Sequence, residues 1–461
     1  MTYVGSHGPF GPFRWLRGRR KGGASGELAE PIRGSILGPD RLRQHAAHLA
    51  RGHRVDRRER RGVRLLDRLD DNERVLRDAY RDLTGAVRRD EAISPAAEWL
   101  LDNFHVVEDQ IRQAGESLPE GYQRRLPRLT RGDLAGHPRV YGLARDYVAH
   151  TDSRFDPDTL VCFVEAYQEV APLDIGELWA VPSSLRLVLI ENLRRLAERV
   201  VGSRVARAEA ERVARAIRLS VEEEDDPVAP LRSQEGGGAR MGRAFVVEMV
   251  QRLREEDPRV TPVLRWLEER AGTSVEELVR SEHASQLSAQ ATVANIVSSM
   301  RKTSAFGWAD FFEDVSRVER ILREDSTGVY PRTDFATRDD YRHAVEELSR
   351  GSEIGEEEVA RRVLDRARRA GEAEEDARAG FLGYHLVLEG RGAFEKELGY
   401  RVPLGRRLYR AFVAAAYPGY FGTLALVTLT VLALPLTYAT MAGAGTWVTA
   451  LIVLLALFPA T

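Results

Sequence analysis

Four polar residues between positions 98 and 109 have the types and spacing of a metal–carboxylate site. Glu98, Asp102, His105 and Asp109 lie at i, i+4, i+7 and i+11, so one continuous helix would place them on a single face. Asp102 and His105 also have the i, i+3 spacing of the Glu-x-x-His pairs that hold iron in four-helix bundles. Such sites need carboxylates from about four helices and a second pair of this kind, which the sequence does not offer. We therefore expect a solvated or hydrogen-bonding helix face.

A second candidate is the Asp-x-Asp spelling of Asp156, Pro157 and Asp158. Many glycosyltransferases use two aspartates at this spacing to hold a metal-bound sugar nucleotide. Here the aspartate precedes a proline, which is typical of a helix start, so N-capping explains the pattern without a ligand. His150, Asp152 and Asp156 form a similarly weak cluster.

Three further groups of side chains could bind a ligand or a metal, but each also has a simpler structural explanation. Histidines at positions 45–53 could bind a metal, but nothing in the sequence orients them, so an exposed helix is expected. A polar line at 283–290 could bind a polar ligand, although such groups more often satisfy one another between helices. An aromatic cluster at 308–312 could stack on a sugar ring, although aromatic residues at this spacing usually belong to a core. The groups are His45, His48 and His53; His283, Gln286 and Gln290; and Trp308, Phe311 and Phe312.

None of these patterns supports an assigned site. The triple glycine at 236–238 lacks both a preceding strand and a following Gly-Lys-Ser/Thr, so it is not a phosphate loop. The sequence contains no convincing nucleophile–base pair and no credible metal cluster. We therefore assign no catalytic, cofactor-binding or metal-binding residue, and do not expect the chain to be a complete enzyme.

The composition limits the partners and the compartment. The chain of 461 residues has 68 basic and 70 acidic side chains, a net charge of −2, which argues against a nucleic-acid partner. Cys162 is the only cysteine, so no intrachain disulfide forms, and a reducing compartment is consistent with the composition. The arginines near the N-terminus are not followed by an apolar segment, so no secretory signal is expected.

The elements that would position these residues read as helices, and we predict an all-α fold. Ser94 with Pro95 opens a helix over 96–113, and Asp156 with Pro157 opens another. An apolar stripe at three-to-four spacing runs from Leu178 to Val200, with Pro182 either kinking the helix or marking its start. Ser274 with Glu277 caps a helix towards position 301, and Thr337 with Asp340 gives a looser version of the same signal.

Composition shifts divide the chain into five parts. We predict that residues 1–30 are a disordered basic tail, 31–220 a helical domain, and 243–410 a second helical region. Residues 221–242 carry an acidic run, prolines and the triple glycine, and predict a linker. Residues 411–461 are predicted to enter a membrane.

The membrane prediction rests on the absence of charge. No Asp, Glu, Lys, Arg or His occurs in residues 411–461, and 421–440 has about the length of a spanning helix, roughly 20 residues. Residues 446–458 begin a second apolar segment that is too short to span comfortably. Arginines lie directly before the first segment, which predicts a cytoplasmic location for residues 1–410. They are Arg401, Arg406, Arg407 and Arg410.

Several separated phrases, taken in order, resemble a known family. They are AAEWLLDNFHVVE at 96–108, PRVY at 138–141, AHTDS at 149–153, IGELWA at 175–180, IENLRR at 190–195, DFATRD at 334–339 and GYHL at 383–386. Followed by apolar helices, they resemble the N-terminal region of bacterial cyclic β-1,2-glucan synthases, over about residues 31–461.

The resemblance implies an inner-membrane glycosyltransferase that polymerises glucose from UDP-glucose, cyclises the product and supplies it to the periplasm. In that family the transferase domain, with its metal-binding carboxylates, and phosphorylase-like domains follow the first membrane helices. The expected partners are therefore the lipid bilayer and those downstream domains, with UDP-glucose and a divalent metal needed only by the complete enzyme. We expect the chain alone to be inactive. The alternative is a free-standing helical membrane protein with a scaffold or regulatory role.

Overall fold

The structure is a computed structural model that describes residues 30–56, 62–117, 120–236, 242–253, 258–373, 378–443, 445–447 and 451. Their regular secondary structure is almost entirely helical, which confirms the predicted all-α class. The chain forms two compact units, Met1–Ile321 and Leu322–Thr461. The predicted basic tail, except Glu30, and most of the second apolar segment lie outside the described residues.

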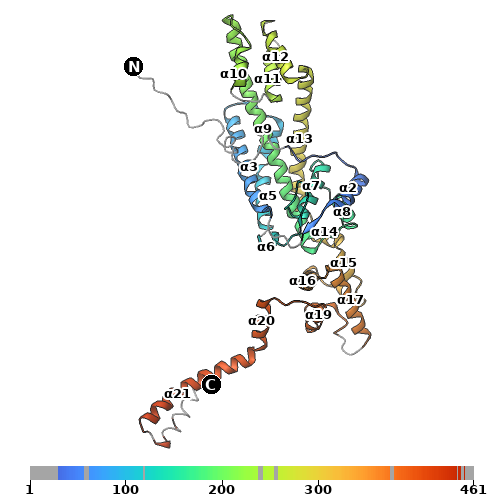
Figure 1. Ribbon diagram of the computed structural model, residues 1–461, viewed down its shortest axis with the longest axis vertical. Helices are drawn as coiled ribbons and strands as arrows, with labels where there is room; N and C mark the ends of the chain where they lie inside the picture. The colour runs from blue at the N-terminus through green and yellow to red at the C-terminus, as the bar shows by residue number, and fades with distance from the viewer. Residues whose placement is uncertain are drawn as a thin grey trace. The chain divides into compact units, whose positions relative to one another are not determined.

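Helix α9 (Ile175–Glu222, 48 residues) is the central element of the first unit (Figure 1). Asp174 and Glu177 form a capping box at its start, in which each side chain pairs with the other residue's backbone N–H. Pro182 does not mark the start of the helix. It lies inside the helix, which begins seven residues earlier at Ile175. The helices that pack against α9 include α3 (Leu65–Arg88), α5 (Phe104–Ser117), α7 (Arg139–His150), α11 (Arg243–Leu253), α13 (Val275–Ala305) and the shorter α4 (Pro95–Asp102).

The first half of α9 is buried on all sides. Leu187, Val188, Leu189 and Ile190 are consecutive, and none is more than 1% exposed. A helix that is apolar all round belongs in the middle of a core, because every face needs an apolar neighbour. Between Val201 and Ala210 the residues of α9 are all partly or fully exposed. We call this stretch, residues 202–209, the waist of α9.

The N-terminal elements surround this half of α9. Helix α2 (Pro39–Gly52) packs against α8 (Pro157–Gln168). Two short strands, β1 (Val55–Asp56) and β2 (Arg128–Leu129), pair antiparallel, and α6 (Glu120–Gln123) precedes β2. The described residues 120–138 therefore contain one helical turn and one short strand. After α13 come α14 (Trp308–Val315) and α15 (Arg317–Leu322), and the unit ends at Ile321 within α15.

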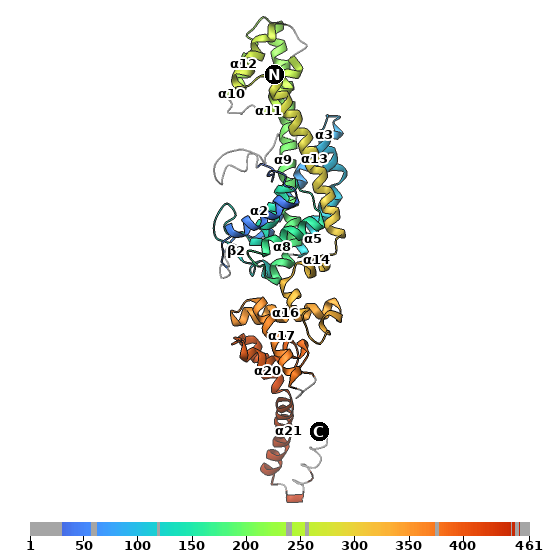
Figure 2. The same ribbon diagram turned by 90° about the vertical axis from the view of Figure 1, so that its right-hand side faces the viewer.

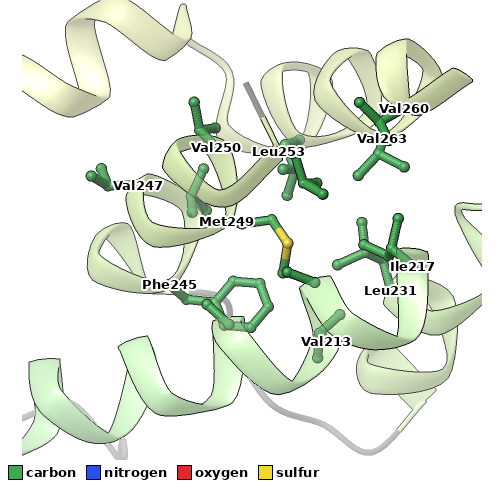
Figure 3. Packing of buried hydrophobic residues seen from close by; sticks show 14 of the residues in the cluster. Val213, Ile217, Leu231, Phe245, Val247, Met249, Val250, Leu253, Val260 and Val263 are labelled. Carbon is green, nitrogen blue, oxygen red and sulfur yellow. The ribbon is translucent and has the colours of Figure 1, made fainter. Parts of the chain in front are cut away.

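Beyond the waist, the second half of α9 has its own apolar cluster (Figure 3). Met249 of α11 lies at its centre and is fully buried. Around it are Val213 and Ile217 of α9, Leu231 of α10 (Ala229–Gly236) and Val263 of α12 (Thr261–Ala271), with the short 3-10 turn η2 (Pro258–Val260) beside them. Figure 2 shows α13 following α9 along this end of the unit.

The boundary between the two compact units lies later in the chain than the predicted linker. The composition of 221–242 suggested the boundary there, but α9 continues to Glu222 and α10 occupies part of the region. Phe245, Met249 and Val250 of α11 then fold back onto α9, because their apolar face has no other cover. The two units instead divide between Ile321 and Leu322.

Two local predictions also differ from the structure. The helix expected over 96–113 is broken at Asn103, whose side-chain amide donates to the Trp99 carbonyl oxygen at 2.8 Å and so competes with the helical hydrogen bonds. The helix near Thr337 is capped by Asp334, whose Oδ1 accepts from the Thr337 backbone N–H at 2.8 Å. The caps predicted at Ser94, Asp156 and Ser274 are present.

The second unit is a compact group of helices. The turn η3 (Tyr330–Arg332) precedes α16 (Phe335–Ser352), which packs against α17 (Glu356–Glu372) and α18 (Leu382–Leu386). Helix α19 (Arg391–Glu397) packs on α18. Val345, Val363, Leu386 and Phe394 are fully buried and form part of its core.

The unit ends in an amphipathic helix that is followed by an apolar one. Helix α20 (Leu404–Ala414) exposes Leu404, Leu408 and Phe412, while Arg410 on another face makes two hydrogen bonds to Glu395, at 2.6 and 2.7 Å. Helix α21 (Ala416–Met441) follows. Among the described residues no single helix meets the length and hydropathy expected of a membrane span. Residues Leu404–Val413 and Pro418–Val431 meet them only as a pair, bent by 64°.

Candidate ligand cavity and histidine cluster

The four residues on the predicted metal-binding face do not form a site. Because Asn103 interrupts the helix, Glu98 and Asp102 lie on α4, while His105 and Asp109 lie on α5. Glu98, Asp102 and His105 are exposed. Asp109 pairs with Arg112 and accepts from the Gln113 amide at 2.7 Å, which are neighbours on its own helix.

The Asp-x-Asp residues are explained by local structure. Asp156 Oδ1 accepts from the backbone N–H and the hydroxyl of Thr159, at 2.9 and 2.6 Å. These hydrogen bonds lower the pKa of Asp156, so the carboxylate is charged while it caps α8. Asp158 is exposed on the first turn of α8. An aspartate that is occupied as a cap has less capacity to hold a metal-bound diphosphate.

The aromatic cluster belongs to the core of the first unit. Phe311 and Phe312 are each 1% exposed. Phe312 stacks on Trp179 of α9 with 4.7 Å between ring centroids, and Trp308 donates its indole N–H to the Thr303 carbonyl oxygen at 2.9 Å. Phe311 and Phe312 therefore present no open face of the kind on which a sugar stacks.

The polar line on α13 does meet a cavity. His283, Gln286 and Gln290 line a hollow of about 300 Å³ between α13, the waist of α9 and the start of α4. Other lining residues include Ser94 and Ser203. The sequence pattern indicated these three α13 residues as a polar line, but not the facing elements, which lie far away in the chain.

The cavity combines charged and apolar surface. Arg207 lies 3.8 Å from Glu282, and Glu282 accepts from the Gln286 amide at 3.0 Å. Glu282 is buried, and these neighbours supply polar contacts to its carboxylate. Among the lining residues there are guanidinium, imidazole, amide and hydroxyl groups, which suit hydrogen bonding to a small polar ligand.

The histidines of α2 have three different environments. His48 is exposed. His53 faces the Tyr167 hydroxyl at 2.8 Å, and burial lowers its pKa, which favours the neutral ring near pH 7. His45 lies 2.9 Å from Asp146, a residue of α7 that the sequence analysis did not name.

His150 joins His45 and Asp146, rather than the residues with which the sequence grouped it. Its ring centroid lies 4.3 Å from that of His45. Asp152 instead accepts from Thr292 at 2.8 Å and from Asn295 at 2.9 Å, both on α13. In the sequence, the i, i+4 spacing of Asp146 and His150 within a single helix was the signal that could have indicated this cluster.

The comparisons with known proteins agree with the resemblance found in the sequence. No family model matches the chain. A curated protein of Rhizobium meliloti (strain 1021), the cyclic beta-(1,2)-glucan synthase NdvB, is 37% identical over 383 residues, which is 80% of this chain. The predicted resemblance to cyclic β-1,2-glucan synthases is thereby confirmed. The chain spans only 13% of that relative's length.

Proposed function

We propose that this chain is the cytoplasmic and membrane-anchoring part of a cyclic β-1,2-glucan synthase and performs no glucosyl transfer by itself. The observation that carries the proposal is 37% identity across 80% of the chain to a synthase of that name. Identity at this level over several hundred residues supports a shared architecture for the matched region. The match leaves the greater part of that synthase without a counterpart here, which supports placing the transfer chemistry elsewhere.

The chemistry of sugar transfer supports the same division. Transfer from UDP-glucose needs a group that neutralises the departing diphosphate, usually a metal held by carboxylates, and a base beside the acceptor hydroxyl. The Asp-x-Asp aspartate at position 156 caps α8. UDP-glucose and its divalent metal are therefore assigned to the other domains of the synthase, with which this chain would associate.

Membrane anchoring is proposed from the C-terminal helices. Residues 411–461 carry no charged side chain, and α21 lies within them. Arg410 of α20 donates a hydrogen bond to Glu395 of α19 within the second unit. On α20 the side chains of Leu404, Leu408 and Phe412 are 76%, 65% and 75% exposed. Exposed leucine and phenylalanine on such a helix suit an acyl-chain boundary. The arginines before α21 favour a cytoplasmic position for residues 1–410 in the bacterial inner membrane.

A complementation experiment tests the proposal. The full chain is produced in membranes with radiolabelled UDP-glucose and Mn²⁺, alone and together with the part of the related synthase that lies outside the match. We expect labelled cyclic glucan only when both are present, and co-purification of the two proteins. Turnover by the chain alone that is lost in Asp156→Ala and Asp158→Ala would contradict the proposal. Failure of the two proteins to associate would favour the alternative, a free-standing scaffold or regulatory membrane protein.

A further inference from the structure

Three potential metal ligands from two helices meet on the surface of the first unit. His45 of α2 and Asp146 and His150 of α7 each direct one ligand atom towards the others, and all three atoms lie within 4.8 Å of one another. Asp146 Oδ1 is 2.9 Å from His45 Nε2 and 3.8 Å from His150 Nε2. Ligand atoms around a tetrahedral Zn²⁺ are about 3.3 Å apart, given zinc–ligand bonds of about 2.0 Å. The observed separations bracket that value.

The hydrogen bonding of His150 leaves the correct nitrogen free for a metal. Its Nδ1 lies 2.8 Å from the Ser35 carbonyl oxygen, which can only accept, so Nδ1 carries the proton. In the neutral ring, Nε2 then presents a lone pair towards the Asp146 carboxylate. Two acceptors that face each other repel, and a cation between them removes the repulsion. A backbone carbonyl that fixes the tautomer is also the usual outer partner of a metal-bound histidine.

The surrounding backbone holds the His150 ring in this orientation. The Gly34 N–H donates to the Ala149 carbonyl oxygen at 2.9 Å, and the Leu37 N–H donates to the His150 carbonyl oxygen at 3.0 Å. A Cβ atom at Gly34 would lie 2.6 Å from His150 Cε1, so the ring packs directly on this glycine. The segment before α2 is therefore tied to the end of α7, and the ligands start close to their bound positions.

We infer that His45, Asp146 and His150 bind a divalent transition-metal ion, with Zn²⁺ well suited to two imidazole nitrogens and one carboxylate oxygen. Their side chains are 26%, 24% and 19% exposed, so an ion can enter from solvent and keep water in its fourth position. On binding, His45 gives up its Nε2–H hydrogen bond to Asp146, and the ring carries its proton on Nδ1. The bound ion would link α2 to α7. This inference does not depend on the function proposed above.

Metal binding is measured on the full chain in detergent after treatment with a chelator. We expect one equivalent of Zn²⁺ by calorimetry and elemental analysis, and a rise in Tm of roughly 5 °C at saturation. Co²⁺ should give the visible absorption of a four-coordinate site. His45→Ala and His150→Ala should each weaken Zn²⁺ binding at least about 100-fold, since loss of an outer partner alone costs about 10- to 100-fold.

Two further variants separate metal binding from folding. His48→Ala removes an exposed histidine from the same helix and should leave Zn²⁺ affinity unchanged. Asp146→Asn keeps an oxygen that can accept from His45, so it should retain the metal-free Tm and lose most of the Zn²⁺-dependent rise. Absence of saturable binding, or equal binding by the His45→Ala variant and the unchanged chain, would overturn the inference. An effect of His48→Ala as large as that of His45→Ala would do so as well.

Discussion

Glu191 in the middle of α9 accepts a hydrogen bond from Arg68 of α3 at 2.6 Å. The carboxylate is 1% exposed and also accepts from the Tyr141 hydroxyl at 2.8 Å and from Arg195 at 2.6 Å. Burial opposes its ionisation, but these hydrogen bonds and the neighbouring guanidinium charges outweigh burial and lower the pKa to about 2. This arrangement links α3, α7 and α9 through one buried negative charge.

Replacing that charge should destabilise the first unit. Glu191→Gln preserves the size of the side chain but leaves Arg68 and Arg195 facing a neutral amide. We expect a loss of about 3 kcal/mol in the free energy of unfolding, measured with urea. Glu73→Gln is the matched control, because Glu73 makes a largely exposed pair with Arg77 at 2.8 Å. It should change stability by less than about 0.5 kcal/mol. Equal losses in the two variants would show that burial does not distinguish these pairs.

The same carboxylate predicts an acid dependence of stability. Since the pKa of Glu191 is about 2 in the folded chain and lies near 4.5 without its partners, its contribution is complete above pH 5. The contribution of about 3 kcal/mol should disappear as the pH falls from about 5 to about 2. Unfolding of the unchanged chain and the Glu191→Gln variant should therefore converge at low pH. A difference that stays constant from pH 7 to pH 3 would contradict the assignment.

A charge placed in the buried half of α9 should be severely destabilising. Leu189 is 1% exposed, and Leu189→Asp would bury an unpaired carboxylate, at a cost above about 4 kcal/mol. Leu219→Asp, on the exposed face of the same helix, is the control, because Leu219 is 54% exposed. Its effect should stay within about 0.5 kcal/mol. Thermal unfolding followed by circular dichroism gives both values, and similar Tm values for the two variants would refute the burial of α9.

The two aspartates of the Asp-x-Asp spelling should differ in their effect on stability. Asp156→Ala removes the cap of α8 and should cost about 1 kcal/mol. Asp158→Ala removes only a favourable charge on the first turn, worth a few tenths of a kcal/mol. Urea unfolding of the two variants measures the difference. A metal-dependent stability that is lost equally in both would instead identify a shared cation site.

Membrane orientation is tested with a reporter that is active only in the periplasm. Fused at Gly242, it should remain silent, because residues 1–410 are proposed to be cytoplasmic. Fused after Met441, at the end of α21, it should be active if this helix crosses the bilayer. Activity at Gly242 would reverse the proposed orientation, and silence at both positions would exclude a crossing by α21.

Local signals predicted the helices well, because they depend on residues close in the chain. Asp156, Ser274 and the apolar stripe from Leu178 each act within a few positions, so the starts of α8 and α13 and the course of α9 follow directly. The acidic and glycine-rich composition of 221–242 was less informative. Composition does not reveal that α11 folds back and extends the same compact unit.

The candidate sites were harder to predict, because they join distant segments. His45 and Asp146 are separated by 101 positions, and only the packing around α2 and α7 brings them to 2.9 Å. The cavity beside α13 likewise needs α4 and α9. Asn103 gave a weak local signal, since a side-chain amide that bonds the preceding turn can end a helix.

The waist of α9 has a consequence for how the first unit opens. The distal cluster around Met249 relies on the outer half of α9, whereas Leu189 and its neighbours are held by the inner half. Because the residues between Val201 and Ala210 are all at least partly exposed, we expect the outer half to release its backbone amides while the inner half stays closed. Native-state hydrogen exchange should therefore separate one long helix into two foldons, and a ligand in the cavity at the waist would slow the exchange of the outer one.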